Sequence, residues 1–205
     1  MTTAAILLAA GESARMGQPK PLLPWGEVTL IEYQVRELRA AGIEVIVAVL
    51  GHEADAVRPR VPVGARIVVN EAYRDGRASS LRAGAKALDD AAGPIAVLNV
   101  DQPRPRDLLR TLLAAHGEVD AAITLPVYEG KRGPPVIVDG SLLTELRNAS
   151  EEDRGLRGII TAHDDGVHEV EVKSSIARLD INTPADYERA LAAFGLTGSG
   201  LAPEG

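Results

Sequence analysis

The sequence has no cysteine, which excludes disulfides, thiolate nucleophiles and zinc sites with Cys ligands. Aromatic residues make up only 3% of the 205 residues, so the core has to be built mainly from Ala, Val, Leu and Ile. No apolar run approaches the roughly 20 residues that a membrane-spanning helix requires, and no Lys or Arg precedes the first apolar segment. We therefore expect a cytoplasmic protein with neither a signal peptide nor a membrane partner.

An excess of basic residues is also missing, because the formal net charge is −7. A general nucleic-acid binder usually presents a basic surface, so we expect no nucleic-acid partner. A nucleotide site needs only a few well-placed cations, and the charge leaves that class open. The length and the 45% apolar content fit one α/β domain, which we expect over residues 1–194. A flexible tail rich in Gly, Ser and Pro is expected over 195–205.

Strand-like and helix-like segments alternate along most of the chain. Buried strands are predicted before Gly11 and at 44–50, 65–69, 95–100, 121–125 and 136–138, with an edge strand at 168–172. Helices are predicted between Thr29 and Gly42, near 53–58, from Ser79 or Ser80 to about 88, at 105–116, 141–147 and 154–163, and from Thr183 onward; 131–135 is predicted as a loop. This order predicts one Rossmann-like three-layer α/β/α domain with a mostly parallel sheet, whose ligands lie beyond the carboxyl ends of the strands.

The segment 4–20 (AAILLAAGESARMGQPK) carries the strongest functional signal. Its apolar run ends at Gly11, and Ser13, Arg15, Gly17 and Lys20 follow within nine residues. Exposed backbone N–H groups and fixed cations are what a triphosphate requires. The spacing fits neither a Walker A loop nor G-x-G-x-x-G. A glycine-rich turn with incidental cations would explain any two of these residues, but not the whole string.

Two acidic positions are candidate metal ligands. Asp101 directly follows the strand predicted at 95–100, where its carboxylate could hold Mg²⁺; the alternative is an Asp that starts a turn before Pro103. Asp180 and Asn182 lie two residues apart, so in an extended segment both side chains point to the same side. Either could complete a metal site with Asp101, and capping ahead of Thr183 explains them equally well.

These motifs together resemble the molybdenum-cofactor nucleotidyltransferases, the MobA-like group, and in particular their molybdopterin cytidylyltransferase branch. The resemblance covers nearly all of residues 4–194. It rests on LAAG at 8–11 through Lys20, Asn70 with Gly76, SSL at 79–81 and Gly84, DQP at 101–103, RGPP at 132–135, DRG at 153–155 with Arg157, and DINTP at 180–184. The first and last of these are shared with many sugar and isoprenoid nucleotidyltransferases, whereas the central ones are narrower.

The resemblance implies a nucleotide-diphospho-sugar transferase-like fold that binds an NTP with Mg²⁺. The expected catalytic residues are Arg15, Lys20 and Asp101, and the expected metal ligands are Asp101, Asp180 and Asn182. The expected nucleotide-binding residues are Leu8, Ala9, Ala10, Gly11, Ser13, Gly17, Asn70, Ser79, Ser80 and Gly84. The expected acceptor-binding residues are Arg132, Gly133, Pro135 and Asp153. Helix capping explains Ser79 or Ser80 equally well, and Arg132 could be a plain solvated cation.

The implied reaction transfers CMP from CTP to the phosphate of molybdopterin, because L-A-A-G is characteristic of cytidylyl transfer and L-A-G-G of guanylyl transfer. A transient contact with a molybdoenzyme or its chaperone would follow. The sequence departs from the family at Pro134, where His is frequent, and at D-R-G-L-R around Asp153. The alternatives are a guanylyl- or other nucleotidyltransferase that acts on a sugar-1-phosphate or a phospholactate-type acceptor, and a non-catalytic protein that delivers cofactor.

Overall fold

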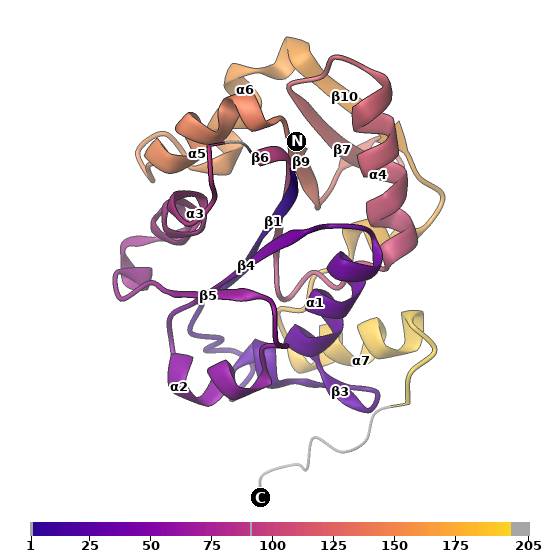
Figure 1. Ribbon diagram of the computed structural model, residues 1–205. Helices are drawn as coiled ribbons and strands as arrows, with labels where there is room; N and C mark the ends of the chain where they lie inside the picture. Colours follow the sequence, from indigo (N-terminus) through magenta and orange to yellow (C-terminus); the bar gives the residue numbers. More distant parts are fainter. Residues whose placement is uncertain (1, 91, 198–205) are drawn as a thin grey trace, which may run out of the picture.

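The computed structural model describes residues 2–90 and 92–197. Its main sheet has the strand order β10-β7-β9-β6-β1-β4-β5, with β8 paired to β7 (Figure 1). The strands are β1 (Thr2–Ala9), β4 (Val45–Leu50), β5 (Arg66–Val69), β6 (Ala92–Asn99), β7 (Ile123–Tyr128), β8 (Lys131–Arg132), β9 (Val136–Val138) and β10 (Val167–Glu171). β1 pairs in parallel with β4 and β6, whereas β9 is antiparallel to both β6 and β7. The predicted mostly parallel sheet is confirmed.

Helices cover both faces of this sheet, as predicted. They are α1 (Leu30–Ala40), α2 (Ala54–Val57), α3 (Arg77–Lys86), α4 (Arg106–Glu118), α5 (Leu143–Asn148), α6 (Leu156–Ala162) and α7 (Pro184–Ala193). Short 3₁₀ turns lie at Lys20–Leu22, Arg58–Arg60, Tyr73–Asp75, Gly140–Leu142, Asp164–Gly166 and Ser175–Arg178, and β2 (Pro24–Trp25) pairs with β3 (Val28–Thr29). One apolar cluster packs α1, α4 and α7 against one face, and a second packs α3, α5 and α6 against the other (Figure 1).

Alternation along β1 shows why the chain forms two cores. Ala5 and Leu7 belong to the cluster beneath α1 and α4, whereas Ala4 and Ile6 belong to the cluster beneath α3. Successive side chains of a strand point to opposite faces, so a strand covered on both sides is apolar throughout. The continuous apolar run that predicted a buried strand is therefore the direct consequence of the three-layer arrangement.

Helix ends follow the predicted capping patterns at two places. Thr183 and Asp186 cap α7 reciprocally: Thr183 Oγ1 accepts from Asp186 N at 3.2 Å, and Asp186 Oδ2 accepts from Thr183 N at 2.8 Å. At α1, Glu32 Oε2 accepts from Thr29 N at 2.7 Å. Each reciprocal pair satisfies donors that a helix start leaves without an intrahelical partner.

Several predicted boundaries were wrong, and three of them lie near the cavities described below. α3 begins at Arg77 after Gly76, so Ser79 and Ser80 lie inside the helix and do not cap it. α6 begins at Leu156 and not at 154, because Arg154 and Gly155 have φ of 62° and 54°, outside the helical region. The loop predicted at 131–135 starts with the short strand β8.

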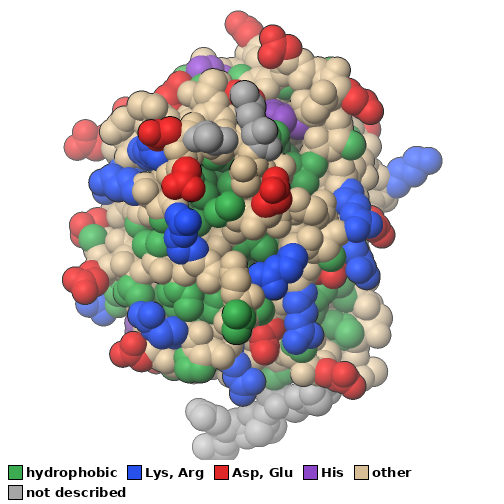
Figure 2. Space-filling view, in the orientation of Figure 1, with side chains coloured by type: hydrophobic (Ala, Val, Ile, Leu, Met, Phe, Trp, Pro, Cys, Tyr) green, Lys and Arg blue, Asp and Glu red, His purple; other side chains and the backbone are tan. Residues whose placement is uncertain are grey.

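The remaining expectations concern the surface and the chain end. On the face shown in Figure 2, Lys and Arg side chains are interspersed with Asp and Glu. Of the predicted tail, 198–205 lie outside the described residues, while Leu196 packs against the core beside α7. Within the described part of the chain, no helix has the length and apolar character needed to cross a membrane.

Candidate active site

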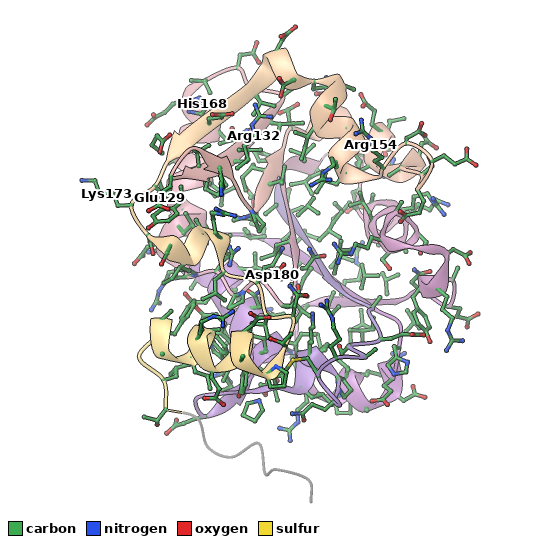
Figure 3. The ribbon with its side chains drawn as sticks, turned by 180° about the vertical axis from the view of Figure 1, so that it is seen from behind. Glu129, Arg132, Arg154, His168, Lys173 and Asp180 are labelled. Atoms are coloured by element: carbon green, nitrogen blue, oxygen red, sulfur yellow. The ribbon has the colours of Figure 1, made fainter. Side chains whose placement is uncertain are left out.

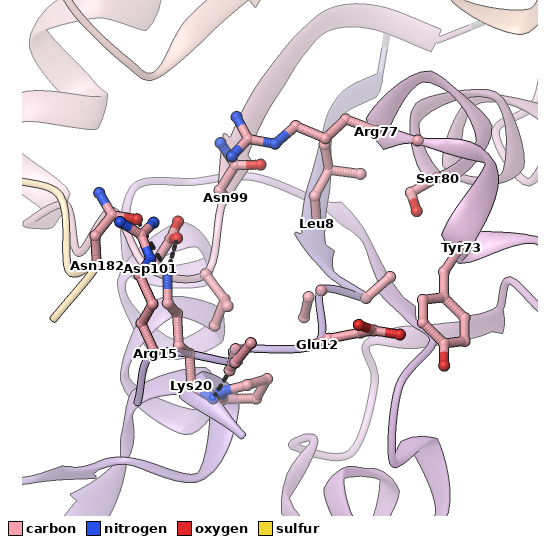
Figure 4. Close-up of a pocket in the computed structure, with 18 residues that line it drawn as sticks. Leu8, Glu12, Arg15, Lys20, Tyr73, Arg77, Ser80, Asn99, Asp101 and Asn182 are labelled. Carbon is pink, nitrogen blue, oxygen red and sulfur yellow. Dashed lines mark hydrogen bonds and ion pairs between the residues drawn. The ribbon is translucent and has the colours of Figure 1, made fainter. Parts of the chain in front are cut away.

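A cavity of about 400 Å³ opens where β1 and β6 end (Figure 4). The loop that follows β1 supplies one wall, and Asp101, two residues beyond β6, supplies another. Asn182 and the start of α3 complete the lining. The carboxyl ends of parallel strands meet at one edge of a sheet, so motifs far apart in the sequence converge here.

Lys20 joins the loop after β1 to Asp101 and Asn182. Its Nζ lies 2.6 Å from Asp101 Oδ2 and 3.2 Å from Asn182 Oδ1 (Figure 4). The Lys20 and Asp101 side chains are only 13% and 16% exposed, so water screens this ion pair weakly. Burial raises the pKa of Asp101 above its usual value, and the Lys20 ammonium opposes that rise. On the main-chain side, Ser13 Oγ accepts from Lys20 N at 3.0 Å.

The oxygens around the Lys20 ammonium fit a divalent cation. A carboxylate and a carboxamide oxygen converge on one positive charge, and both are ligands that Mg²⁺ prefers. Asn182, and not Asp180, is the residue of that motif that lines the cavity; Asp180 is exposed. The described residues include no cluster of three or more His, Cys, Asp or Glu side chains, so a metal here would take further ligands from phosphate or water.

The opposite end of the cavity is lined by Glu12, Tyr73, Ser80 and Arg77 (Figure 4). Glu12 Oε1 accepts from Arg74 Nε at 2.8 Å, which joins the loop after β1 to the segment before α3. Arg15 is an exposed cation in the loop after β1, and it lines the end of the cavity nearest Asp101 (Figure 4). The cavity therefore has cations at its Asp101 end and mixed polar groups at its α3 end.

Asn70 places one of the two predicted serines in the cavity. Its buried Nδ2 donates to Ser79 Oγ at 2.8 Å and to Ser80 Oγ at 2.9 Å. Ser80 lines the cavity, whereas Ser79 is turned toward the main chain and donates to Ala72 O at 2.9 Å. Asn70 and Ser79 thus lie outside the lining and position the residues that form it.

Two predicted glycines also lie outside this lining. Gly84 packs α3 onto the sheet: a Cβ at this position would lie 2.5 Å from Ile6 Cγ2 and 2.9 Å from Val49 Cγ2. Gly17 has φ of 69° and turns the loop between Arg15 and Lys20. The remaining predicted nucleotide-binding residues line the cavity: Leu8, Ala9, Ala10, Gly11, Ser13 and Ser80.

A second cavity, of about 580 Å³, adjoins the first and shares Leu8, Arg77 and Asn99 with it. Its walls are partly aliphatic, with Leu81, Val97, Leu125, Val136, Leu156 and Ile160 among them. Arg132 of β8 and Arg154 of the loop before α6 also line it (Figure 3).

Of the four predicted acceptor-binding residues, only two line this second cavity. Arg132 and Gly133 line it, but Arg132 is already paired, at 2.6 Å each, with Asp164 Oδ1 and Glu169 Oε1. Pro134 lines the cavity in place of Pro135. Asp153 does not line it and lies in a local turn, where its N donates to Ser150 Oγ at 3.0 Å. Arg154 and Arg157 take its place in the lining.

A fully buried arginine, which the sequence did not reveal, holds the loops around both cavities. Arg104 donates to the carbonyl oxygens of Pro103 and Pro134, each at 2.9 Å, and to those of Ala177 and Leu179, each at 3.0 Å. Burial lowers its pKa to about 10, which leaves it charged at neutral pH. It therefore fixes the chain before Asn182 and the loop after Arg132 to the segment that carries Asp101.

Gln34 and Gln102 support the same segment. Gln34, fully buried on α1, donates through Nε2 to Gln102 O at 2.8 Å and accepts from Arg104 N at 3.2 Å. Gln102 Oε1 accepts from Asn99 Nδ2 at 3.0 Å, which orients the carboxamide on the wall between the cavities. The only sequence signal was the polar run QPR directly after Asp101, at the end of a buried strand.

Known proteins share both the sequence pattern and the fold. The chain is 34% identical over 160 residues to nicotine blue oxidoreductase of Paenarthrobacter nicotinovorans. The matched segment covers 74% of this chain and 78% of that protein. It is 26% identical over 189 residues to molybdenum cofactor cytidylyltransferase of Escherichia coli K12, with 89% and 92% covered. The bifunctional protein GlmU of Geobacter metallireducens is 32% identical over 76% of this chain, which spans only 35% of that protein's length.

Among solved structures, Rv0371c from Mycobacterium tuberculosis H37Rv superposes with a TM-score of 0.82 at 29% identity, over 94% of this chain and 98% of that one. Its manganese complex superposes with a TM-score of 0.76 at 28% identity, over 94% and 100%. The family model described as the MobA-like NTP transferase domain matches residues 5–167. The chain therefore belongs to the MobA-like NTP transferase domain family and has the predicted nucleotide-diphospho-sugar transferase-like fold of these nucleotidyltransferases.

Proposed function

We propose that the protein transfers CMP from CTP to the phosphate group of molybdopterin and releases pyrophosphate. The observation that carries the proposal is the Lys20–Asp101–Asn182 cluster, which lies in a cavity that adjoins a second one. The first cavity has the cations and oxygen ligands for a nucleoside triphosphate, and the second has room for the acceptor. The likeness to the Escherichia coli molybdenum cofactor cytidylyltransferase supports this acceptor.

The reaction needs charge neutralisation and positioning more than a covalent intermediate. An oxygen of the acceptor phosphate forms a bond to the α-phosphorus, the bond from that phosphorus to the bridging oxygen breaks, and pyrophosphate leaves with its electron pair. The acceptor phosphate is ionised near pH 7, so no general base is required. Lys20 and Arg15 bind the triphosphate and stabilise the charge that grows on the leaving group.

Asp101 and Asn182 would hold Mg²⁺, and Asp180 would contribute only if its exposed side chain turned inward. When bound, the ion neutralises negative charge on the phosphate oxygens. The manganese complex of Rv0371c supports a divalent metal in this fold. Ser13 holds the main chain at Lys20, and Gln34 with Arg104 holds the segment of Asp101.

The cytidylyl preference rests on Ala10. This residue is 5% exposed, lines the cavity and is packed so closely that a Cβ at Gly51 would lie 2.8 Å from its Cβ. Because Ala10 is tightly packed and cannot move away, its methyl group narrows the base pocket. A narrower pocket favours a pyrimidine base over a purine base.

A sugar-1-phosphate acceptor is the second candidate, because the chain has a nucleotide-diphospho-sugar transferase-like fold. A non-catalytic delivery protein is disfavoured by the Lys20–Asp101 pair, since a carrier has no need of a cation beside a leaving group. An oxidoreductase function, which the likeness to nicotine blue oxidoreductase would suggest, gives no role to the Lys20–Asp101–Asn182 cluster. The binding of phosphate groups does give it a role.

Pyrophosphate release with each of four NTPs, with and without molybdopterin, tests the proposal. We expect release that requires molybdopterin and a divalent metal and is fastest with CTP. Asp101→Ala should lower the rate by about 10²–10³-fold, the usual effect of removing a principal charge-stabilising group, while the fold, followed by circular dichroism, survives. Asp120→Ala, at an exposed carboxylate away from both cavities, is the matched control. Near-normal turnover in Asp101→Ala would show that the metal assignment is wrong.

A further inference from the structure

We propose that Arg77 is a further catalytic residue, which binds the attacking phosphate and the α-phosphate together. The inference rests on the proposed nucleotidyl transfer and adds a group that bridges its two substrates. Three residues form the wall between the cavities, namely Leu8, Arg77 and Asn99. Leu8 is aliphatic and Asn99 is neutral, so within residues 2–90 and 92–197 Arg77 is the one charged side chain common to both cavities.

The Arg77 guanidinium is available for a ligand. In the described part of the chain its side chain makes no hydrogen bond or ion pair, whereas Arg74, Arg104 and Arg132 are all engaged. Its backbone is fixed as the first residue of α3, and its side chain extends from there toward Asn99 (Figure 4).

The chemistry needs a cation at this boundary. The two reacting phosphates are both anionic, and their repulsion rises as the attacking oxygen approaches the α-phosphorus. Arg15 and Lys20 face the nucleotide cavity, and Arg154 and Arg157 face the other one. A planar guanidinium carries five N–H donors, so one group can donate to both phosphates at once, which a lysine ammonium does less well.

The step is balanced without any further reactant. The acceptor oxygen donates the electron pair of the new P–O bond, the bond between the α-phosphorus and the bridging oxygen breaks, and pyrophosphate takes that pair. Arg77 keeps its proton throughout and stabilises the equatorial oxygens, on which charge is greatest as the two bonds exchange. A group that acts at this stage raises kcat more than it tightens nucleotide binding.

Arg77→Gln, Arg77→Lys and Arg77→Ala test the role, with Lys86→Gln as the control. Lys86 is exposed on the same helix and lines neither cavity. We expect kcat to fall by about 10²–10³-fold in Arg77→Gln, with direct binding of CTP and Mg²⁺ almost unchanged. Arg77→Lys should lie between Arg77→Gln and the wild type, and added methylguanidinium should restore part of the turnover of Arg77→Ala. Wild-type kcat in Arg77→Gln, or an equal loss in Lys86→Gln, would overturn the inference.

A binding experiment separates this inference from the proposed function. Inorganic phosphate, used as a probe for the acceptor phosphate, is titrated calorimetrically into the protein saturated with CTP and Mg²⁺. We expect the wild type and Lys86→Gln to bind phosphate and Arg77→Gln to bind it at least about tenfold more weakly, the loss expected from one charge-assisted contact. If the wild type turns over no acceptor but shows this Arg77 dependence, the proposed acceptor is wrong and the anion site at Arg77 stands. Equal phosphate binding by wild type and Arg77→Gln, or none by either, would overturn the inference.

Discussion

At the scale of single residues, the Lys20 ammonium donates hydrogen bonds to two side-chain oxygens. These oxygens belong to residues 81 and 162 positions away in the chain. We expect Lys20→Ala to lower kcat by about 10²–10³-fold and to weaken NTP binding less. The reason is that negative charge accumulates on the leaving pyrophosphate, and only stabilisation that is stronger in the transition state raises the rate. Single-turnover rates and direct nucleotide titration measure the two effects separately.

Lys173→Ala is the control for this prediction, because Lys173 is exposed in the chain after β10 and lines neither cavity (Figure 3). If Lys20→Ala weakens NTP binding as much as it lowers kcat/KM, and kcat is unchanged, Lys20 serves only as an anchor for the nucleotide.

Ala10→Gly is expected to relax the preference for CTP over GTP without inverting it. A single methyl group discriminates by about 1–3 kcal/mol, roughly 10–200-fold, and other groups in the pocket must hydrogen-bond the base. Competition between equimolar CTP and GTP measures the ratio in the wild type and in the variant. A wild-type protein that prefers GTP would contradict the cytidylyl assignment and leave the family membership untouched.

The sequence predicted Lys20 and Asp101 because they follow apolar strands, and Asn182 because it belongs to the recognisable segment DINTP. It did not predict Arg104, whose hydrogen-bond partners are main-chain carbonyls. Every residue carries a carbonyl, so no side-chain pattern marks such a partner. Arg77 was missed for a different reason: its position between two cavities depends on how the cavities adjoin, which only the folded chain defines.

At the scale of elements, α3 lies close to β1 and β4 because Gly84 has no side chain. Gly84→Ala should destabilise the protein by about 1–3 kcal/mol, since the added methyl would lie 2.5 Å from Ile6 Cγ2 in a fully packed core. Urea unfolding followed by circular dichroism measures this loss.

Gly117→Ala in α4 is the matched control, because a Cβ there has nothing within 4 Å. That change should leave the stability unaltered or raise it by up to about 1 kcal/mol, since Ala favours the helix over Gly. Equal effects of the two substitutions would show that the close contact at Gly84 is not what fixes α3.

Periodicity predicted those elements that bury an apolar face, and it failed where burial is small. β8 consists of Lys131 and Arg132, both exposed, so no apolar alternation marks it. The start of α3 was placed too late because serines are good caps in general, whereas here Gly76, with φ of 101°, turns the chain into the helix. Ser80 is instead held inside the helix, with its hydroxyl in the cavity.

At the scale of the whole molecule, the overall stability should fall in mild acid because of His116. This side chain is 4% exposed, its Nδ1 lies 2.9 Å from Thr124 Oγ1, and burial lowers its pKa. A lowered pKa in the folded state means that the stabilisation is complete above the pKa of the unfolded chain, about 6.5, and is lost as the pH falls through the folded value. Asp139 Oδ2, 3.9 Å from Nε2, opposes the shift without cancelling it.

The free energy of unfolding, measured from about pH 7.5 to 5, tests this in the wild type and in His116→Gln, which keeps a polar group near Thr124. We expect His116→Gln to have a lower free energy of unfolding than the wild type at about pH 7.5. Its free energy of unfolding should also change less with pH over this range. Parallel curves for the two proteins would contradict the assignment to His116.

The order of strands and helices was enough to predict the layers and the edge at which ligands bind, because right-handed crossovers leave few alternatives. The insertion of β9, antiparallel between β6 and β7, could not be predicted, since three apolar residues fit either direction. That insertion carries the chain from Arg132 back beside β6, and Val136 of β9 lines the second cavity.

The carbonyl contacts of Arg104 have a consequence for protein engineering. One side chain holds the segments at 103, 134 and 177–179, so the loops around the two cavities are not structurally independent of one another. A loop transplanted from a relative at 131–135 would have to present a carbonyl where Pro134 does, or a buried cation would lose a partner. Attempts to redesign the acceptor preference should therefore exchange these three segments as a set.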